Sequence, residues 1–259
     1  MRNLLRLPYV FCHGAGVLRN FFDESEAANY DEGSADMFAP AVLEPTVDFL
    51  AELAGDGAVL ELGIGTGRVA LPLSQRGVPV CGIDLSPAMV DRLKAKPGGD
   101  AIDVTIGDFA TTNMNRTFRL VYLVFNTINN LTTQNDQVAC FRNAASHLEP
   151  GGCFVIEVGV PDLQRLPRGE TIRPFMVSPT RLGFDEYDVV KQGLISHHYR
   201  VVEGRLDAFS IPFRYVWPSE LDLMAQMAGM TLRERWASWT REPFTSTSDS
   251  HISVWEKTG

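Results

Sequence analysis

The hydrophobic positions of residues 58–158 fall into short β-branched runs separated by longer stretches with a helical period. The runs predict five strands, at residues 58–62, 78–83, 103–106, 120–125 and 153–158. Helices are expected between them at residues 67–76, 87–96 and 135–147, and a further helix at 40–53 precedes the first strand. Because strands alternate with helices, this half of the chain is predicted to be an α/β domain with a parallel sheet.

The pattern changes after residue 158, where apolar and polar residues alternate on a two-residue period over 181–192, 194–203 and 205–217. Gln192-Gly193 and Glu203-Gly204 suit the turns between these segments, so an antiparallel β-meander is predicted as an insertion after the fifth strand. A helix is expected from Pro218 to about Gly229, followed by strands at 231–237 and 251–257 that complete a sheet of seven strands.

This pattern divides the chain into three parts. Residues 1–54 are expected to form an N-terminal arm and helical cap, and residues 55–160 together with 218–259 the main domain. Residues 161–217 form the inserted antiparallel subdomain. Ligands of open α/β sheets bind outside the carboxyl ends of the strands, where the insertion begins, so we expect the insertion to cover a substrate there.

A glycine-rich turn follows the first predicted strand, in Glu61-Leu62-Gly63-Ile64-Gly65-Thr66-Gly67. Its glycines allow close approach of a ligand to the backbone, and the helix start beyond them offers free N–H groups to an anion. No G-K-[ST] ending follows, which excludes a P-loop, but the turn also fits the G-x-G-x-x-A dinucleotide pattern, so an NAD(P)-dependent oxidoreductase stays open. Glu61 favours a cofactor with an ammonium group, because a carboxylate on an apolar strand needs a partner.

Polar residues also follow the next three strands. Asp84 lies about 20 residues after the glycines, the spacing at which a carboxylate meets ribose hydroxyls, although capping of the next helix is an alternative role. Asp108 precedes Phe109 after the third strand, where the acid can accept a hydrogen bond from an adenine amino group. Phe125 and Asn126 end the fourth strand at the mouth of the expected cleft.

Taken together, the glycine turn, Gly82-Ile83-Asp84-Leu85-Ser86, Gly107-Asp108-Phe109 and Leu148-Glu149-Pro150-Gly151-Gly152 resemble the successive motifs of class I S-adenosylmethionine-dependent methyltransferases. The resemblance implies a Rossmann-like fold whose last strand is antiparallel, with S-adenosylmethionine as cofactor and S-adenosylhomocysteine as product. It further implies that Gly63 and Gly65 approach the methionyl group and that Asp84 binds the ribose. Adenine would be flanked by Leu85, Met89 and Phe109, with Asp108 on its amino group.

The insertion is similar in layout to that of small-molecule members, such as the sugar-amine N-methyltransferases. Tyr30, beside Asp31, resembles the N-terminal tyrosine that covers the cofactor in several of them, although an ordinary loop aromatic is an equal alternative. No [Asn/Asp]-Pro-Pro-aromatic stretch follows the fourth strand, which argues against nucleobase and amide acceptors. Asn126, Asn129 and Asn130 are neutral, so no metal is predicted there.

The candidate general bases are two adjacent histidines in the meander, His197 and His198. Strand alternation places them on opposite faces, so one of them is expected to face the cleft. A solvent-facing or structurally satisfied histidine is the alternative for either one. An amine acceptor needs only to be unprotonated, whereas a hydroxyl acceptor would profit from such a base. The stripe Phe209, Ile211, Phe213, Tyr215, Trp217 is expected to pack on the main domain or to line a pocket, and Arg214 and His198 are expected to meet the acceptor.

Composition narrows the partners. The net charge of −9 gives no general attraction for a phosphate backbone, so nucleic acid is not an expected partner. Residues 161–217, however, contain eight Lys and Arg and seven Asp and Glu, so this segment is slightly basic while the rest of the chain is acidic. An anionic small-molecule acceptor would suit this difference in charge. No run of about 20 apolar residues predicts a membrane span.

The sequence gives weaker indications of the protein's cellular location and of its oligomeric state. The four cysteines have no CxxC spacing, and the apolar run at residues 4–11 is interrupted by Arg6 and Pro8, so a cytoplasmic location is expected. A homodimer is considered as the assembly. A cofactor-binding protein without catalytic activity also stays open, since such a protein can keep these motifs.

Overall fold

The structure is a computed structural model and describes residues 20–202 and 204–259. The apolar run at residues 4–11, Cys12 and the beginning of the expected N-terminal arm therefore lie outside the described residues. Within the described ranges, no helix has the length and apolar character needed to cross a membrane.

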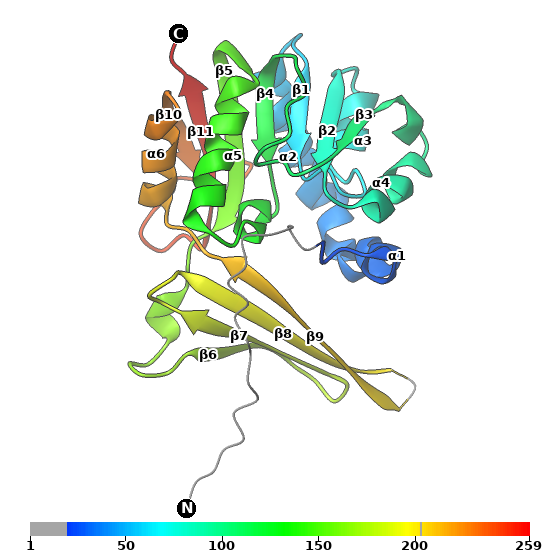
Figure 1. The fold of residues 1–259 in the computed structure, drawn as a ribbon, viewed down its shortest axis with the longest axis vertical. Coiled ribbons are helices and arrows are strands. Elements are labelled where there is room, and N and C mark those ends of the chain that lie inside the picture. The colour runs from blue at the N-terminus through cyan, green and yellow to red at the C-terminus, as the bar shows by residue number, and fades with distance from the viewer. Residues whose placement is uncertain (1–19, 203) are drawn as a thin grey trace, which may run out of the picture.

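A seven-stranded sheet forms the centre of the larger part of the molecule, in the order β10-β11-β5-β4-β1-β2-β3 (Figure 1). Five strands run parallel: β1 (Val59–Leu62), β2 (Val80–Asp84), β3 (Asp103–Ile106), β4 (Phe118–Leu123) and β5 (Leu148–Gly159). The last strand, β11 (Ser250–Lys257), runs antiparallel between β5 and β10 (Met230–Trp236). The predicted fold class and the antiparallel last strand are thus confirmed.

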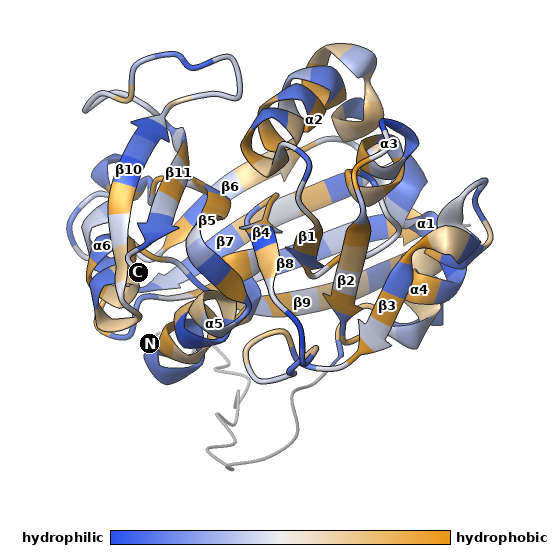
Figure 2. Ribbon diagram, turned by 90° about the horizontal axis from the view of Figure 1, so that it is seen from above, coloured by the Kyte–Doolittle hydropathy of each residue, from blue (hydrophilic) through white to orange (hydrophobic). Residues whose placement is uncertain are grey.

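Helices cover both faces of this sheet. One face packs against α5 (Gln134–Ser146) and α6 (Pro218–Met227), and the other against α2 (Pro40–Ala54), α3 (Ala70–Gln75) and part of α4 (Pro87–Lys94). Every residue of β1 and β2 is consequently buried, as expected for parallel strands with helices on both sides. Figure 2 shows the same arrangement from above.

A separate four-stranded antiparallel sheet lies across the edge of the main sheet at which β5 ends (Figures 1 and 2). Its strands are β6 (Ile172–Val177), β7 (Arg181–Asp188), β8 (Gly193–Val202) and β9 (Arg205–Arg214), in that order. The meander was predicted with three strands, and β6 was missed. Pro174 and a register shift beside it break the two-residue period there, and most of the strand is exposed.

Two further differences concern the cofactor side. Helix α1 (Glu24–Gly33) was not predicted, because ESEAANYDEG carries no apolar stripe. Strand β4 ends at Leu123 rather than at the predicted residue 125, because Phe125 and Asn126 have φ of 57° and 60° and so cannot continue a strand.

Candidate active site

The glycine-rich turn after β1 presents bare backbone to the edge of the sheet. Gly63 and Gly65 have φ of 73° and 56°, which side chains rarely tolerate. A Cβ on Gly63 would lie 2.7 Å from Cγ2 of Thr127, and one on Gly65 would lie 3.4 Å from Cε of Met89. The turn is therefore a cradle that a Cβ would partly fill, and it fits the cofactor that the motifs imply.

Asp84 supports this cradle directly. One carboxylate oxygen accepts a hydrogen bond from the Gly65 N–H at 2.7 Å, and the other accepts from the Ser86 N–H at 2.8 Å. Burial raises the pKa of Asp84, and hydrogen bonds from backbone N–H groups oppose that rise. The alternative role of capping falls to Ser86, whose hydroxyl accepts from the Met89 N–H. Each oxygen of Asp84 keeps a further lone pair for a ribose hydroxyl.

Glu61 lies beneath the glycine turn rather than in the open cleft. Its carboxylate is buried and accepts a hydrogen bond from the Tyr122 hydroxyl at 2.9 Å. Burial raises its pKa to about 8, although the Tyr122 bond and the nearby charge of Arg68 both act to lower it. Glu61 is therefore a group whose protonation a neighbouring cation would change.

The turn opens into a cavity of about 910 Å³ between the two sheets. Glu61 is the one predicted cofactor residue that does not line it. The ten that do come from α1, the glycine turn, the ends of β2, β3 and β4, and helix α4: Tyr30, Gly63, Gly65, Asp84, Leu85, Met89, Asp108, Phe109, Phe125 and Asn126. Sequence reasoning thus selected residues that the fold gathers on one wall.

Helix α1 carries Tyr30 to this wall and is held there by polar contacts. Asp31 accepts from the Thr66 hydroxyl at 2.6 Å and pairs with Lys96 at 2.6 Å, which ties the helix to the glycine turn. The Tyr30 ring packs edge-on against Phe22, and burial raises the pKa of its hydroxyl. The prediction that this tyrosine covers the cofactor is compatible with that position.

Two residues that contact Phe125 of this wall were missed by the sequence analysis. The Arg68 guanidinium lies 5.3 Å from the centre of the Phe125 ring, and its charge opposes the rise that burial causes in the pKa values of Tyr30 and Glu61. Its position directly after the third glycine was the available signal. Glu157 accepts from the Phe125 N–H and the Trp239 indole N–H, both at 2.9 Å, and so holds the left-handed turn in place. No sequence signal pointed to Glu157.

The opposite wall belongs to the meander. Phe209, Ile211 and Phe213 line the cavity, so this part of the aromatic stripe lines a pocket, which was one of its two expected roles. Tyr215 is buried but is not a lining residue. Arg181 and Arg200 also line the cavity, and Arg200 pairs with Asp207 at 2.6 Å.

The two histidines separate as strand alternation predicts. His198 lines the cavity, with its ring stacked on Phe209 at 4.7 Å between centres. Burial, together with the charges of His197 and Arg200, lowers the pKa of His198. His197 lies on the outer face, where it bonds to Ser210 at 2.8 Å and stacks on Phe184. His197 is not among the residues that line the cavity, so its role as a catalytic base stays a prediction that this position does not favour.

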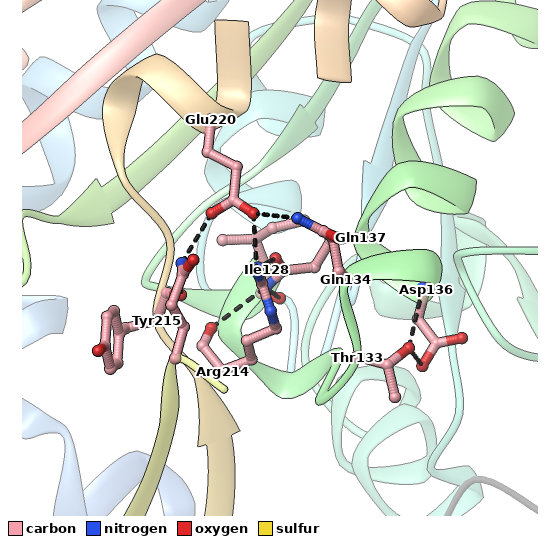
Figure 3. Close-up of polar contacts among 9 residues, drawn as sticks. Ile128, Thr133, Gln134, Asp136, Gln137, Arg214, Tyr215 and Glu220 are labelled. Atoms are coloured by element: carbon pink, nitrogen blue, oxygen red, sulfur yellow. Dashed lines mark hydrogen bonds and ion pairs between the residues drawn. The ribbon is translucent and has the colours of Figure 1, made fainter. Parts of the chain in front are cut away.

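Arg214, expected to meet the acceptor, instead joins the meander to the main domain (Figure 3). Its guanidinium donates to Gln137 of α5 and to Glu220 of α6, the latter at 2.7 Å, and only 4% of the residue is exposed. Burial alone would raise the pKa of Glu220, but hydrogen bonds from Arg214, Gln192 and Gln134 lower it. We call Arg214, Glu220, Gln137 and Gln192 the polar anchor.

Metal binding has no visible basis in this part of the chain. Among residues 20–202 and 204–259, no three His, Cys, Asp or Glu side chains gather as a metal ion would require. The absence of a metal remains a prediction.

Comparison with known proteins adds independent information. Residues 59–152 match a family model described as a methyltransferase domain. The solved structure of the CcbJ methyltransferase from Streptomyces caelestis is 37% identical, with a TM-score of 0.80 over 90% of this chain and 96% of that chain.

Two more distant proteins extend the comparison. Cypemycin N-terminal methyltransferase from Streptomyces sp is 28% identical over 247 residues, which are 90% of this chain and 99% of that protein. The amino pentose methyltransferase CalS10 from Micromonospora echinaspora, solved with S-adenosylmethionine bound, is 22% identical. It matches 94% of this chain and 100% of its own with a TM-score of 0.64, so it shows the shared fold.

Proposed function

The chain belongs to the S-adenosylmethionine-dependent methyltransferases, and on that premise we propose that it methylates an amine of a small molecule. S-adenosylmethionine is its cofactor and S-adenosylhomocysteine its product. The matches to methyltransferases do not favour the oxidoreductase alternative. Bound in the cradle, the cofactor would supply an activated methyl group for in-line displacement, so catalysis rests largely on how the acceptor is held.

One observation carries the choice of an amine. The acceptor wall is built from aromatic rings, with Phe175 and Phe209 on either side of His198, whose pKa is lowered by burial. An amine must be unprotonated to accept a methyl group, and a neutral imidazole in an apolar wall can take its proton. The ring faces would then stabilise the cationic product. The names of the relatives, which include an N-terminal and an amino pentose methyltransferase, agree with this choice.

The cofactor wall is proposed to work as the motifs imply. Gly63 and Gly65 would let the methionyl group approach, Asp84 would bind the ribose, and Asp108 the adenine amino group. Leu85, Met89 and Phe109 would flank the adenine, with Phe125 and Asn126 at the methyl end. To these we add Arg68 as a partner for the cofactor carboxylate, close to Glu61, which would meet the ammonium group.

The division of the chain follows from these roles. Residues 55–160 and 218–259 would hold the cofactor, residues 161–217 would cover the acceptor, and the described part of 1–54 would close over the cofactor. Arg181 on the acceptor wall would suit an anionic group elsewhere on the acceptor. The cytoplasmic location stays a prediction, which the three free cysteines Cys81, Cys140 and Cys153 support, and the homodimer is untested.

The test compares matched acceptors. The enzyme is incubated with methyl-labelled S-adenosylmethionine and pairs of compounds that differ only in amine or hydroxyl, drawn from amino sugars, amino acid esters and short peptides. We expect label in the amines, with kcat/KM reduced by Phe209→Leu but not by Val201→Leu on the outer face. Equal or faster labelling of the hydroxyl partners would contradict the amine, and cofactor binding without any transfer would favour a non-catalytic protein.

A further inference from the structure

A polar chain runs through the acceptor wall toward His198. Asp185 of β7 lies directly across from Ser196 of β8, and His198 follows on the same face of the same strand. The Ser196 hydroxyl lies 3.1 Å from Nε2 of His198, and hydrogen bonding from Ser196 lowers the pKa of the Asp185 carboxyl against the raising effect of burial. The three side chains therefore form a connected series inside the meander.

The His198 ring is held in one plane by its neighbours. Phe209 stacks on it with only 4° between the planes, and Phe175 of β6 covers it from the other side at 5.3 Å. Phe175 reaches this position because the residue opposite His198 is Gly183, where a Cβ would lie 2.4 Å from the Phe175 ring. The ring is thus fixed in orientation, and the direction of its hydrogen bond sets which nitrogen carries the proton.

The directions of the hydrogen bonds among Asp185, Ser196 and His198 follow from counting the protons that each side chain carries. An ionised carboxylate can only accept, so Ser196 gives its single hydroxyl proton to Asp185. The Ser196 oxygen is then left to accept from His198, which requires a proton on Nε2. A neutral imidazole has one N–H, so Nδ1 carries the lone pair. Within the described ranges, the hydrogen bond of the His198 ring is the one that joins Nε2 to Ser196.

The charges around the series favour this arrangement. Burial raises the pKa of the Asp185 carboxyl, and the charges of His197 and of Arg173, which lies opposite Asp185 on β6, oppose that rise. On the other side, His197 and Arg200 lower the pKa of His198, and the charge of Arg200 is partly offset by Asp207 of β9. The neighbouring charges thus favour the Asp185 anion against the effect of its burial, whereas burial and charge both favour a neutral His198 imidazole.

We propose that Asp185 and Ser196 are positioning residues that hold His198 with its proton on Nε2 and so make Nδ1 the atom that takes a proton from the acceptor. The proposal rests on the proposed amine acceptor. A protonated amine would lose one N–H proton to Nδ1, keep the electron pair on nitrogen, and leave an imidazolium whose charge Asp185 stabilises through Ser196. His198 is the catalytic residue in this step, and Asp185 and Ser196 act through it.

The first measurement needs no acceptor. Imidazole ¹⁵N–¹H correlation spectra distinguish the two neutral tautomers, and His198→Gln identifies the signals of His198 among the five histidines. We expect the Nε2–H form in the wild type, a shift toward Nδ1–H in Ser196→Ala and Asp185→Asn, and recovery in Ser196→Thr. Ser210→Ala, which removes the hydroxyl bonded to His197 on the outer face, is the matched control and should leave His198 unchanged.

The second measurement is kinetic. With an amine acceptor, His198→Gln should lower kcat by a hundredfold or more, about the contribution of a general base. Ser196→Ala and Asp185→Asn should lower kcat about tenfold and move the acidic limb of the pH profile, with KM for the cofactor unchanged. An Nδ1–H form in the wild type, or a tautomer that neither variant alters, would overturn the positioning role. Should amines not be methylated while the spectra agree, only the proposed acceptor is wrong.

Discussion

The two sheets of this molecule are stabilised in different ways. Both hydrophobic core clusters lie on the seven-stranded sheet and its helices, and neither includes a described residue of the four meander strands. In β8 the buried residues are Ser196 and His197, and β6 is exposed at all positions but one. Apolar burial thus holds the cofactor wall, whereas stacked rings, cross-strand pairs and the polar anchor hold the acceptor wall.

This difference in packing corresponds to two separate tasks of the protein, which are to hold the cofactor and to accommodate the acceptor. A cofactor wall made from a dry core gives a fixed geometry, and substitutions within it are costly. An acceptor wall without a core of its own can exchange side chains at little cost to the fold, because few of them fill buried space. The shape and charge of the acceptor site can therefore vary while the methyl donor stays in place.

Breaking the polar anchor should produce the largest effect. Arg214→Ala leaves the Glu220 carboxylate, 15% exposed, without its guanidinium, and we expect a loss of about 3–5 kcal/mol in the free energy of unfolding. Urea denaturation measures the loss, and limited proteolysis should show earlier cleavage in the meander than in the wild type.

The control for this variant is Arg233→Ala. Arg233 pairs with Glu256 at 3.5 Å, and both side chains are nearly half exposed, so its removal should cost less than about 1 kcal/mol. A similar small loss for Arg214→Ala would show that the anchor does not hold the two sheets together.

A smaller effect, confined to the cofactor wall, is expected at Asp84. Asp84→Ala should weaken binding of S-adenosylhomocysteine by about 1–3 kcal/mol, the value of a hydrogen bond to a charged group. Because Asp84 also accepts hydrogen bonds from the N–H groups of Gly65 and Ser86, Asp84→Ala should lower the thermal stability as well. Asp84→Asn should retain part of that stability. Calorimetry and melting curves separate the two effects, and unchanged affinity in Asp84→Ala would remove its ribose role.

The effect of Glu61 is small at each step of pH because it is spread over several pH units. Its pKa is about 8 in the folded protein, against an ordinary value of 4.5, so the unfolded chain releases this proton first as the pH rises. Stability from this group is complete below pH 4.5 and is lost up to about pH 8, by at most about 1.4 kcal/mol per unit. Glu61→Gln should flatten this slope in melting curves of the ligand-free enzyme.

The same variant also reports on the cofactor. An ammonium beside Glu61 favours the ionised carboxyl, so affinity for S-adenosylhomocysteine should rise with pH toward 8 in the wild type and not in Glu61→Gln. Parallel affinity curves for the two proteins would show that Glu61 does not meet the cofactor.

Sequence reasoning worked best where structure is set by local pattern. The central strands β1, β2, β4 and β5 have strong apolar runs, and the glycines and acids that follow β1 and β2 are placed by the strands themselves. It failed where a segment depends on distant partners. Helix α1 lacks an apolar face and is held by the contacts of Asp31 with Thr66 and Lys96, which no local pattern reveals.

The acceptor wall shows the same limit. Alternation correctly separated His197 from His198, but it cannot say which face of a sheet turns toward the main domain. The face that turns toward the main domain is set by the way the meander docks through Arg214. An arginine at this position of a strand would equally suit an exposed site, so the sequence does not reveal the docking role. Glu157 was missed for the same reason, because its two hydrogen bonds join segments that are far apart in the chain.

The place of β11 has a consequence for synthesis of the protein. Trp255 of this strand packs against Phe141 and Phe154, and β11 pairs with β5 along residues 153–159. During translation, all the cofactor-wall motifs and the whole meander emerge before residues 250–257 do. Until then β5 has an open, apolar edge, which is the kind of surface that chaperones bind and that pairs wrongly with other chains. We therefore expect that slow translation or truncation near residue 250 yields aggregated protein rather than a partly active enzyme.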